Sequence, residues 1–174
     1  QDFSFRQIEG QADLRDVHIF GRSIFLGDVR LERTVHVDTL DPEQDPAGSS
    51  VVELQAGDHE FRNVDIIAVE RQGLSVRNAT VASSDLQVAS QREIPLFVFN
   101  ATLTSTRTVL LAKSSSGLGL HLLGSKAKLH QLAMYGFDIA VLMSGIAELE
   151  NELVEAEMSQ SWLHFHSHRG IIGF

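Results

Sequence analysis

Two histidines near the C-terminal end of the chain occupy alternate positions, a spacing that can hold a metal ion. In a β-strand, alternate side chains project from the same face, so His164 and His166 would point the same way. Neutral imidazole nitrogens are common zinc ligands, and His121 is the candidate for a third ligand. The alternative is that these histidines are ordinary surface residues. Taken as a whole, the sequence predicts no bound cofactor.

Two aspartates could form a catalytic pair if their strands lie side by side. Asp65 and Asp85 are predicted to project outward from neighbouring strands. Paired carboxylates can act as general acid and base on a glycosidic bond, or share a cation. His164 is the third group that could take part in catalysis. We favour the alternative that both aspartates are exposed acids of an acidic protein, because no other reactive group converges on them.

One acidic segment interrupts the apolar pattern of the chain. Residues 38–50 (DTLDPEQDPAGSS) hold two of the three prolines and have no apolar periodicity, which predicts an exposed inserted loop. Its carboxylates, which could bind calcium, are those of Asp38, Asp41, Glu43 and Asp45. Their spacing differs from that of an EF-hand, and acidic loops of this composition are usually only solvated.

The positions of all these groups depend on a repeat that runs through most of the chain. Residues 74–88 (LSVRNATVASSDLQV) and 96–111 (LFVFNATLTSTRTVLL) carry three apolar pairs in the same order, about 22 residues apart. Apolar–polar alternation predicts half-buried strands, which we name a, b and c in chain order. The pairs predicted to face inward in strand a are Ile24/Leu26, Val52/Leu54, Leu74/Val76, Leu96/Val98, Leu120/Leu122, Val141/Met143 and Leu163/Phe165. Those of strand b are Val29/Leu31, His59/Phe61, Ala79/Val81, Ala101/Leu103, Ala127/Leu129 and Ala147/Leu149. Those of strand c are Val35/Val37, Val64/Ile66, Leu86/Val88, Val109/Leu111, Leu132/Met134 and Val154/Ala156.

Turn residues between strands a and b support the same division of the chain. Glycine and asparagine tolerate the left-handed backbone that a sharp corner needs. Such residues recur at the predicted a–b corner, at Gly27-Asp28, Gly57-Asp58, Asn78, Asn100, Gly124-Ser125 and Ser144-Gly145. Asn78 and Asn100 also begin Asn-Ala-Thr sequons, which a eukaryotic secretory pathway could glycosylate. We favour the structural role at the corner.

The repeat predicts an all-β fold, a right-handed parallel β-helix of about seven or eight coils with three strands per coil. A coil cannot bury its own apolar stripe, so equivalent strands stack in parallel about 4.8 Å apart. We expect one domain over residues 1–174, with residues 1–16 as an incomplete first coil or a capping segment. Residues 146–158 also fit helical spacing, but the alternation in Val154/Ala156/Met158 favours strands.

Composition limits the classes of partner. A net charge of −9 argues against nucleic acid and anionic membranes, both of which attract Lys and Arg. The chain has no run of 18 apolar residues, so we predict no membrane span. It also has no cysteine, which excludes disulfides and thiolate metal sites.

The coil length, the three strands per coil and the corner asparagines Asn78 and Asn100 resemble those of the pectate-lyase-like superfamily of parallel β-helices. This resemblance covers about residues 20–170. It implies an extracellular or cell-surface location and contact with extended carbohydrate along an outer face. Members include polysaccharide lyases, hydrolases, uronate epimerases and adhesins, so the fold alone does not choose an activity.

An apolar stripe is predicted on the outer face of strand a, where water would otherwise lie. Its residues are Phe97, Phe99, Leu123, Leu142 and Trp162. Such a stripe is covered by the chain itself, forms a protein or self-association surface, or stacks on sugar rings. We therefore expect a non-catalytic module for adhesion, polysaccharide contact or self-association. The alternative is a carbohydrate-active enzyme: a polysaccharide lyase, a hydrolase or a uronate epimerase.

Overall fold

The protein is a right-handed parallel β-helix, and every described strand pairs in parallel with the equivalent strand of the next coil. The computed structural model describes the backbone of residues 2–3, 7–39, 49–91, 94–112, 117–151, 154–157 and 162–173. It describes the side chains of residues 7–39, 49–91, 94–112, 117–139 and 141–150. None of these residues is helical, so the predicted all-β fold is confirmed, including strands in the region that also fitted helical spacing.

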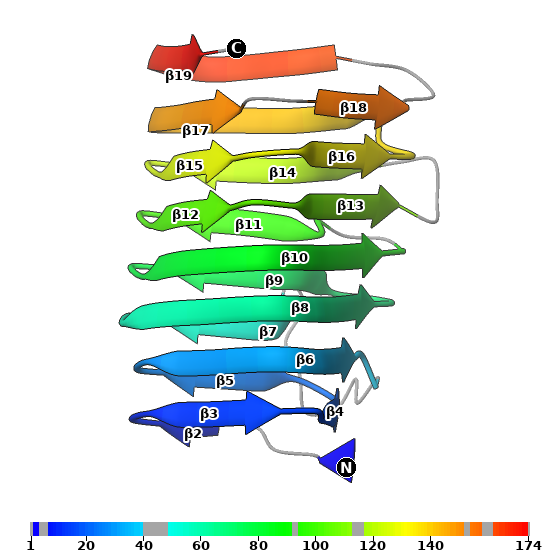
Figure 1. Ribbon diagram of the computed structural model, residues 1–174. Helices are drawn as coiled ribbons and strands as arrows, with labels where there is room; N and C mark the ends of the chain where they lie inside the picture. Colours follow the sequence, from blue (N-terminus) through cyan, green and yellow to red (C-terminus); the bar gives the residue numbers. More distant parts are fainter. Residues whose placement is uncertain are drawn as a thin grey trace.

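The strands belong to one continuous parallel sheet wound round the axis of the stack, in which strands a, b and c each stack on their equivalents in the neighbouring coils (Figure 1). Strand a is formed by β2 (Gln7–Glu9), β5 (Ser23–Leu26), β7 (Ser50–Gln55), β9 (Gln72–Arg77), β11 (Leu96–Phe99) and β14 (Leu118–Leu123). Strand b is formed by β3 (Ala12–Arg15), β12 (Thr102–Ser105) and β15 (Lys126–Leu129). Strand c is formed by β4 (His18–Phe20), β13 (Thr108–Ala112), β16 (Leu132–Tyr135) and β18 (Val154–Glu157). Strands b and c are continuous in β6 (Val29–Val37), β8 (Asp58–Ala68) and β10 (Thr80–Ser90), and a and b in β17 (Ile139–Asn151).

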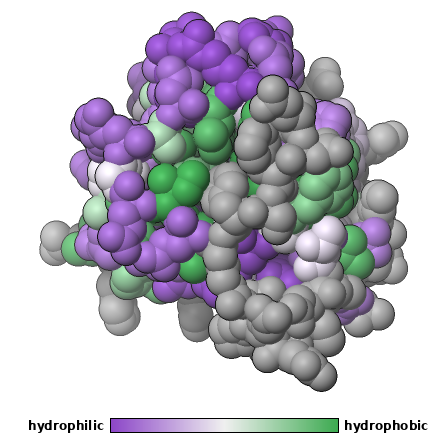
Figure 2. Space-filling view, turned by 90° about the horizontal axis from the view of Figure 1, so that it is seen from below, coloured by the Kyte–Doolittle hydropathy of each residue, from purple (hydrophilic) through white to green (hydrophobic). Residues whose placement is uncertain are grey.

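The stack ends in a short strand at its N-terminal end and in a long strand at its C-terminal end. β1 (Asp2–Phe3) pairs with β4, and β19 (Trp162–Gly173) pairs with β17. β2 and β3, which lie within the predicted capping segment, pair with β5 and β6 as a further coil. Figure 2 looks along the stack from its N-terminal end and shows hydrophobic residues in the middle of the view, with hydrophilic ones bordering them above and on the left. Apolar side chains therefore lie inside the coils and polar ones mostly outside.

The interior is formed largely by the predicted inward residues. Between residues 52 and 149, every pair predicted to face inward is buried except Val109/Leu111. Leu74, Leu96 and Leu120, for example, are stacked in register and have no exposed surface. The predicted pairs Val154/Ala156 and Leu163/Phe165 have side chains outside the described residues.

Three of the predicted inward pairs are wrong, each by one residue. The pairs that lie outside and are half-buried are Ile24/Leu26, Val35/Val37 and Val109/Leu111. Their buried neighbours, which face inward, are Ser23/Phe25, Thr34/His36 and Thr108/Leu110. Register decides the face: Thr108 pairs with Leu86 on one side and with Leu132 on the other. Because side chains alternate along a strand, a shift of one residue exchanges the two faces.

Buried hydroxyl groups explain why hydrophobicity alone predicted the wrong inward face for these strands. Ser83 Oγ and Thr108 Oγ1 each donate a hydrogen bond of 2.7 Å to Ser105 Oγ inside the coils. Thr34 Oγ1 lies 3.2 Å from Nε2 of His36, which has no exposed surface. Polar groups that form hydrogen bonds with one another can be buried at a small cost in free energy. The aliphatic residues next to them in the same strands then lie on the outer face.

Both corners beside strand b contain left-handed residues. At the a–b corner, Gly27, Gly57, Asn78, Asn100 and Gly124 have positive φ, which confirms the predicted turn positions. At the b–c corner, left-handed residues also recur at equivalent positions, at Asp16, Arg33, Asn63, Asp85 and Gln131. The sequence did not reveal this second set, because residues such as Arg33 seldom mark a left-handed turn.

Asp38 is part of the core architecture rather than of an exposed loop. Its carboxylate is buried, with Oδ1 3.1 Å from Nε of the buried Arg71. Oδ2 accepts hydrogen bonds from the backbone N–H groups of Val69 and Glu70. The other three candidate calcium ligands, Asp41, Glu43 and Asp45, lie outside the described residues.

Candidate functional site

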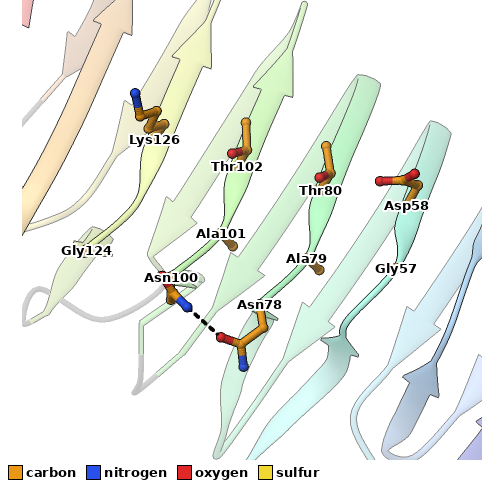
Figure 3. Close-up of a pocket in the computed structure, with 10 residues that line it drawn as sticks. All are labelled: Gly57, Asp58, Asn78, Ala79, Thr80, Asn100, Ala101, Thr102, Gly124 and Lys126. Carbon is orange, nitrogen blue, oxygen red and sulfur yellow. Dashed lines mark hydrogen bonds between the residues drawn. The ribbon is translucent and has the colours of Figure 1, made fainter.

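The a–b corner forms a shallow polar hollow of about 560 Å³ on the outer surface (Figure 3). It crosses four successive coils, whose equivalent residues Asp58, Thr80, Thr102 and Lys126 lie side by side in register. The remaining lining residues are small or amide-bearing: Gly57, Asn78, Ala79, Asn100, Ala101 and Gly124. The hollow therefore presents hydroxyl, amide and charged groups along a line parallel to the axis.

Two further hollows extend this line in both directions. One shares Asp58 and continues to Asp28 and Gln11 in the N-terminal coils. The other shares Thr102 and Lys126 and continues to Glu148. Because they share these residues, the three hollows follow one another along the outer face of strand b from Gln11 to Glu150, and we call this line of hollows the axial furrow. In the sequence the outward side chains of strand b resemble ordinary solvated surface, and the repeated Asn-Ala-Thr is the one signal that points to the furrow.

The corner asparagines form one wall of the furrow. Asn100 Nδ2 donates a hydrogen bond of 2.8 Å to Asn78 Oδ1, and both residues are exposed (Figure 3). Their φ angles of 51° and 47° are left-handed, which asparagine tolerates better than most residues. The side-chain bond fixes the orientation of one amide against the next. The asparagines thus contribute a rigid polar edge.

The charge of the lining side chains varies along the furrow. Asp28 and Asp58 lie in adjacent coils near its N-terminal end, and a hydrogen bond from the Asp58 backbone N–H lowers the pKa of the Asp28 carboxyl. The middle is uncharged, with Thr80 and Thr102. Beyond it, Lys126 lies 3.0 Å from the carboxylate of Glu148, and Lys128 pairs equally closely with Glu150. A ligand lying along the furrow meets acids, then hydroxyls, then ion pairs.

The predicted apolar stripe on strand a is a small aromatic cluster. The rings of Phe97 and Phe99 stack with centroids 6.5 Å apart and planes within 11°. The imidazole of His121 lies 5.1 Å from the Phe97 ring, and the Arg77 guanidinium lies 5.4 Å from it on another side. All four residues are half-buried. The cluster is therefore less exposed than the sequence suggested.

Of the other residues in the predicted apolar stripe, two extend the aromatic cluster and one does not line up with it. Leu123 pairs in register with Phe99, and Leu142 pairs with His121, so both extend the cluster into the next coils. The backbone of Trp162 pairs with Ile139 rather than with Leu142. Its side chain lies outside the described residues, as do those of His164 and His166.

A polar network adjoins the aromatic cluster on its N-terminal side. Arg22 Nη2 donates a hydrogen bond of 2.7 Å to Glu53 Oε2, and Gln55 Nε2 donates one of 2.8 Å to Oε1. Burial raises the pKa of Glu53, but these bonds outweigh it, so the net shift is downward. Arg77 Nε donates to Ser75 Oγ and lies 3.6 Å from Glu53. Arg22, Gln55 and Arg77 thus surround the Glu53 carboxylate with hydrogen bonds and positive charge.

The histidine metal site receives no support from the part of the chain whose side chains are described. His121 Nε2 lies 3.4 Å from Ser144 Oγ, and burial lowers its pKa. The backbone of His164 pairs with Leu142, which itself lies between it and His121. Among the described side chains, no group of three His, Asp or Glu residues could hold a metal ion.

The two candidate catalytic aspartates do not lie opposite each other. Asp65 pairs in register with Gln87, and burial raises the pKa of its carboxyl. Asp85 lies at the b–c corner, where its carboxylate is 2.5 Å from the Arg107 guanidinium. An ion pair of this kind holds a corner together and leaves no carboxyl positioned to act with Asp65.

No family model matches the chain, and comparisons with curated proteins and with solved structures give no significant match. Within the described residues, no helix has the length and apolar character needed to cross a membrane.

Proposed function

We propose that the protein is a non-catalytic binding module, displayed outside the cell, that holds an extended polysaccharide in the axial furrow. The observation that carries this proposal is the continuity of three hollows through shared residues Asp58, Thr102 and Lys126. Adjacent coils repeat about every 4.8 Å, which is comparable with the length of one sugar residue in an extended chain. Each coil can therefore offer equivalent groups to successive sugars.

The chemistry of the furrow suits a neutral or weakly charged polymer. Thr80, Thr102, Asn78 and Asn100 supply hydroxyl and amide groups, which both donate and accept hydrogen bonds as sugar hydroxyls do. A strongly anionic polymer would be repelled by Asp28 and Asp58 and by the net charge of −9. The resemblance of the coils to the pectate-lyase-like superfamily supports an extended polysaccharide as the ligand, without choosing its charge.

The test is affinity electrophoresis of the protein through gels that contain neutral or acidic soluble polysaccharides. We expect retardation by at least one neutral polymer. The variant Thr102→Trp fills the middle of the furrow and should weaken retardation at least tenfold. The matched control is Phe97→Ser/Phe99→Ser on strand a, which should bind like the parent protein.

Three results would contradict the proposal. Retardation by no polysaccharide would remove the function itself. Loss of binding in the Phe97→Ser/Phe99→Ser variant alone would move the site to the aromatic cluster. Release of oligosaccharides from the retained polymer would instead support the carbohydrate-active enzyme, which the sequence left as the alternative.

A further inference from the structure

One corner of the axial furrow differs from the equivalent corner of the next coil at four consecutive positions. Residues 56–59 (AGDH) align in register with residues 78–81 (NATV). Asp58 thus takes the place of a threonine that lines the furrow, as Figure 3 shows, and His59 takes the place of a buried valine. Where a regular structure breaks its own pattern, function rather than folding is a common reason.

Asp58 lies together with Asp28 of the preceding coil. The backbone N–H of Asp58 donates a hydrogen bond of 3.0 Å to Oδ1 of Asp28, and Gln11 Nε2 donates one of 3.4 Å to Oδ2. Gly57 permits this approach, because a Cβ atom there would lie 2.9 Å from the same Oδ1. Both aspartates are exposed and line the same hollow. The corner therefore holds the Asp28 carboxylate beside Asp58.

These two acids are the uncompensated charges of the furrow. Among the described residues, neither has a Lys or Arg at ion-pair distance. The other charged side chains that line the three hollows have partners of opposite charge: Asp13 with Arg15, Arg30 with Glu60, Lys126 with Glu148, and Lys128 with Glu150. The negative charge that a ligand meets in the furrow is therefore concentrated at one corner.

His59 belongs to the same corner and adds no positive charge to it. The residue lines the hollow with the two aspartates and is only 3% exposed. Its Nε2 donates a hydrogen bond of 2.8 Å to the carbonyl oxygen of Ala56, so its Nδ1 carries a lone pair, which has no partner among the described residues. Burial lowers the pKa of His59 although the carboxylates of Asp28 and Asp58 oppose this shift, so the ring is neutral at neutral pH. The corner thus offers hydrogen-bond acceptors and negative charge.

We propose that this corner binds the ammonium group of an amino sugar, an inference that rests on the polysaccharide-binding function proposed above. An ammonium group supplies one positive charge and three N–H donors, which suit carboxylates that have no cationic partner. A metal ion suits the corner less well, because no group of three His, Asp or Glu residues among the described side chains could hold one. Since Thr80 and Thr102 in the next two coils are uncharged, the ligand is a largely neutral polymer that carries some free amino groups.

The experiment is isothermal titration calorimetry of the whole chain with two hexasaccharides, one of glucosamine and one of N-acetylglucosamine, at about pH 6, where amines are protonated. We expect the glucosamine hexasaccharide to bind at least about threefold more tightly, the effect of one exposed ion pair. Asp58→Asn keeps an acceptor oxygen and removes the charge. It should abolish this advantage and leave the affinity for the N-acetylglucosamine hexasaccharide unchanged.

The matched control is Asp65→Asn, which removes the same charge from the outer face of strand c. It should keep the advantage of the glucosamine hexasaccharide. Thermal melts followed by circular dichroism show that each variant is folded.

Three outcomes would overturn the inference. Equal affinity for the two hexasaccharides would exclude the ammonium subsite and leave the proposed function standing. An advantage that survives in Asp58→Asn, or that Asp65→Asn also removes, would assign it to the net charge of −9. Binding of neither hexasaccharide would exclude the subsite as well, and the gels with neutral polysaccharides would then decide the proposed function on their own.

Discussion

A histidine inside the coils predicts that acid destabilises the fold. His36 is fully buried on the inner face of β6, its Nε2 lies beside Thr34 Oγ1, and its Nδ1 has no hydrogen-bond partner. Burial lowers the pKa of His36 from 6.5 to about 3, with no charged group contributing to the shift. The folded state therefore keeps a neutral imidazole at pH values where the unfolded chain takes up a proton.

The sign and size of the effect follow from this difference. Stability from neutral His36 is fully present above pH 6.5 and is lost progressively as the pH falls from 6.5 toward about 3. Each unit of pKa corresponds to about 1.4 kcal/mol. At pH 5, about 1.5 pH units below the unfolded pKa, protonation of the unfolded chain lowers the free energy of unfolding by about 2 kcal/mol. The full difference, reached near pH 3, is about 5 kcal/mol.

Urea denaturation at pH 7 and pH 5 measures this loss. Because other groups also titrate, the comparison is with His36→Leu, which has a similar volume and no titratable ring. The parent protein should lose about 2 kcal/mol more than the variant between the two pH values. Equal losses in both proteins would show that His36 does not remain neutral and buried, and would refute the reasoning.

Two other predictions concern the faces and corners of the coils. Leu103 is fully buried and Thr102 is exposed. Leu103→Asp should therefore abolish folding through an unpaired buried charge, while Thr102→Asp should melt near the temperature of the parent protein. Similar melting temperatures for the two variants would contradict this assignment of inward and outward faces. Asn100 is left-handed and bonded to Asn78, so Asn100→Ala should lose about 1–2 kcal/mol in urea denaturation. Asn100→Gly should lose less than Asn100→Ala, because glycine needs no compensation for positive φ, and the opposite order would count against a backbone role.

The architecture could be predicted from the sequence because two independent signals agree. Spacing of apolar pairs such as Leu74/Val76 and Leu96/Val98 fixed the coil length, and the corner residues Asn78 and Asn100 fixed where strand a ends. It was harder to predict which side chains of a strand face inward where both alternating sets contain apolar residues. In Ser23–Leu26 the inward residues are Ser23 and Phe25, and only pairing with Val52 and Leu54 decides this.

The candidate sites were harder to predict than the fold. A furrow arises from how neighbouring coils align, and Thr80 or Lys126 has no unusual feature within its own strand. Phe97 and Phe99, in contrast, were visible because bulky rings at outward positions break the pattern of the preceding coil.

The regular pairing of equivalent strands makes the length of the molecule adjustable in whole steps. Leu74 pairs with Leu96, and Thr80 with Thr102, so residues 74–95 constitute one complete turn that ends in register with its own beginning. A tandem duplication of this turn adds one strand to each stack of equivalent strands and leaves the pairs on either side unchanged. It also lengthens the axial furrow by the same increment. If the furrow binds a polysaccharide as we propose, the number of turns sets how long a stretch of polymer it can hold, and one tandem duplication changes that length.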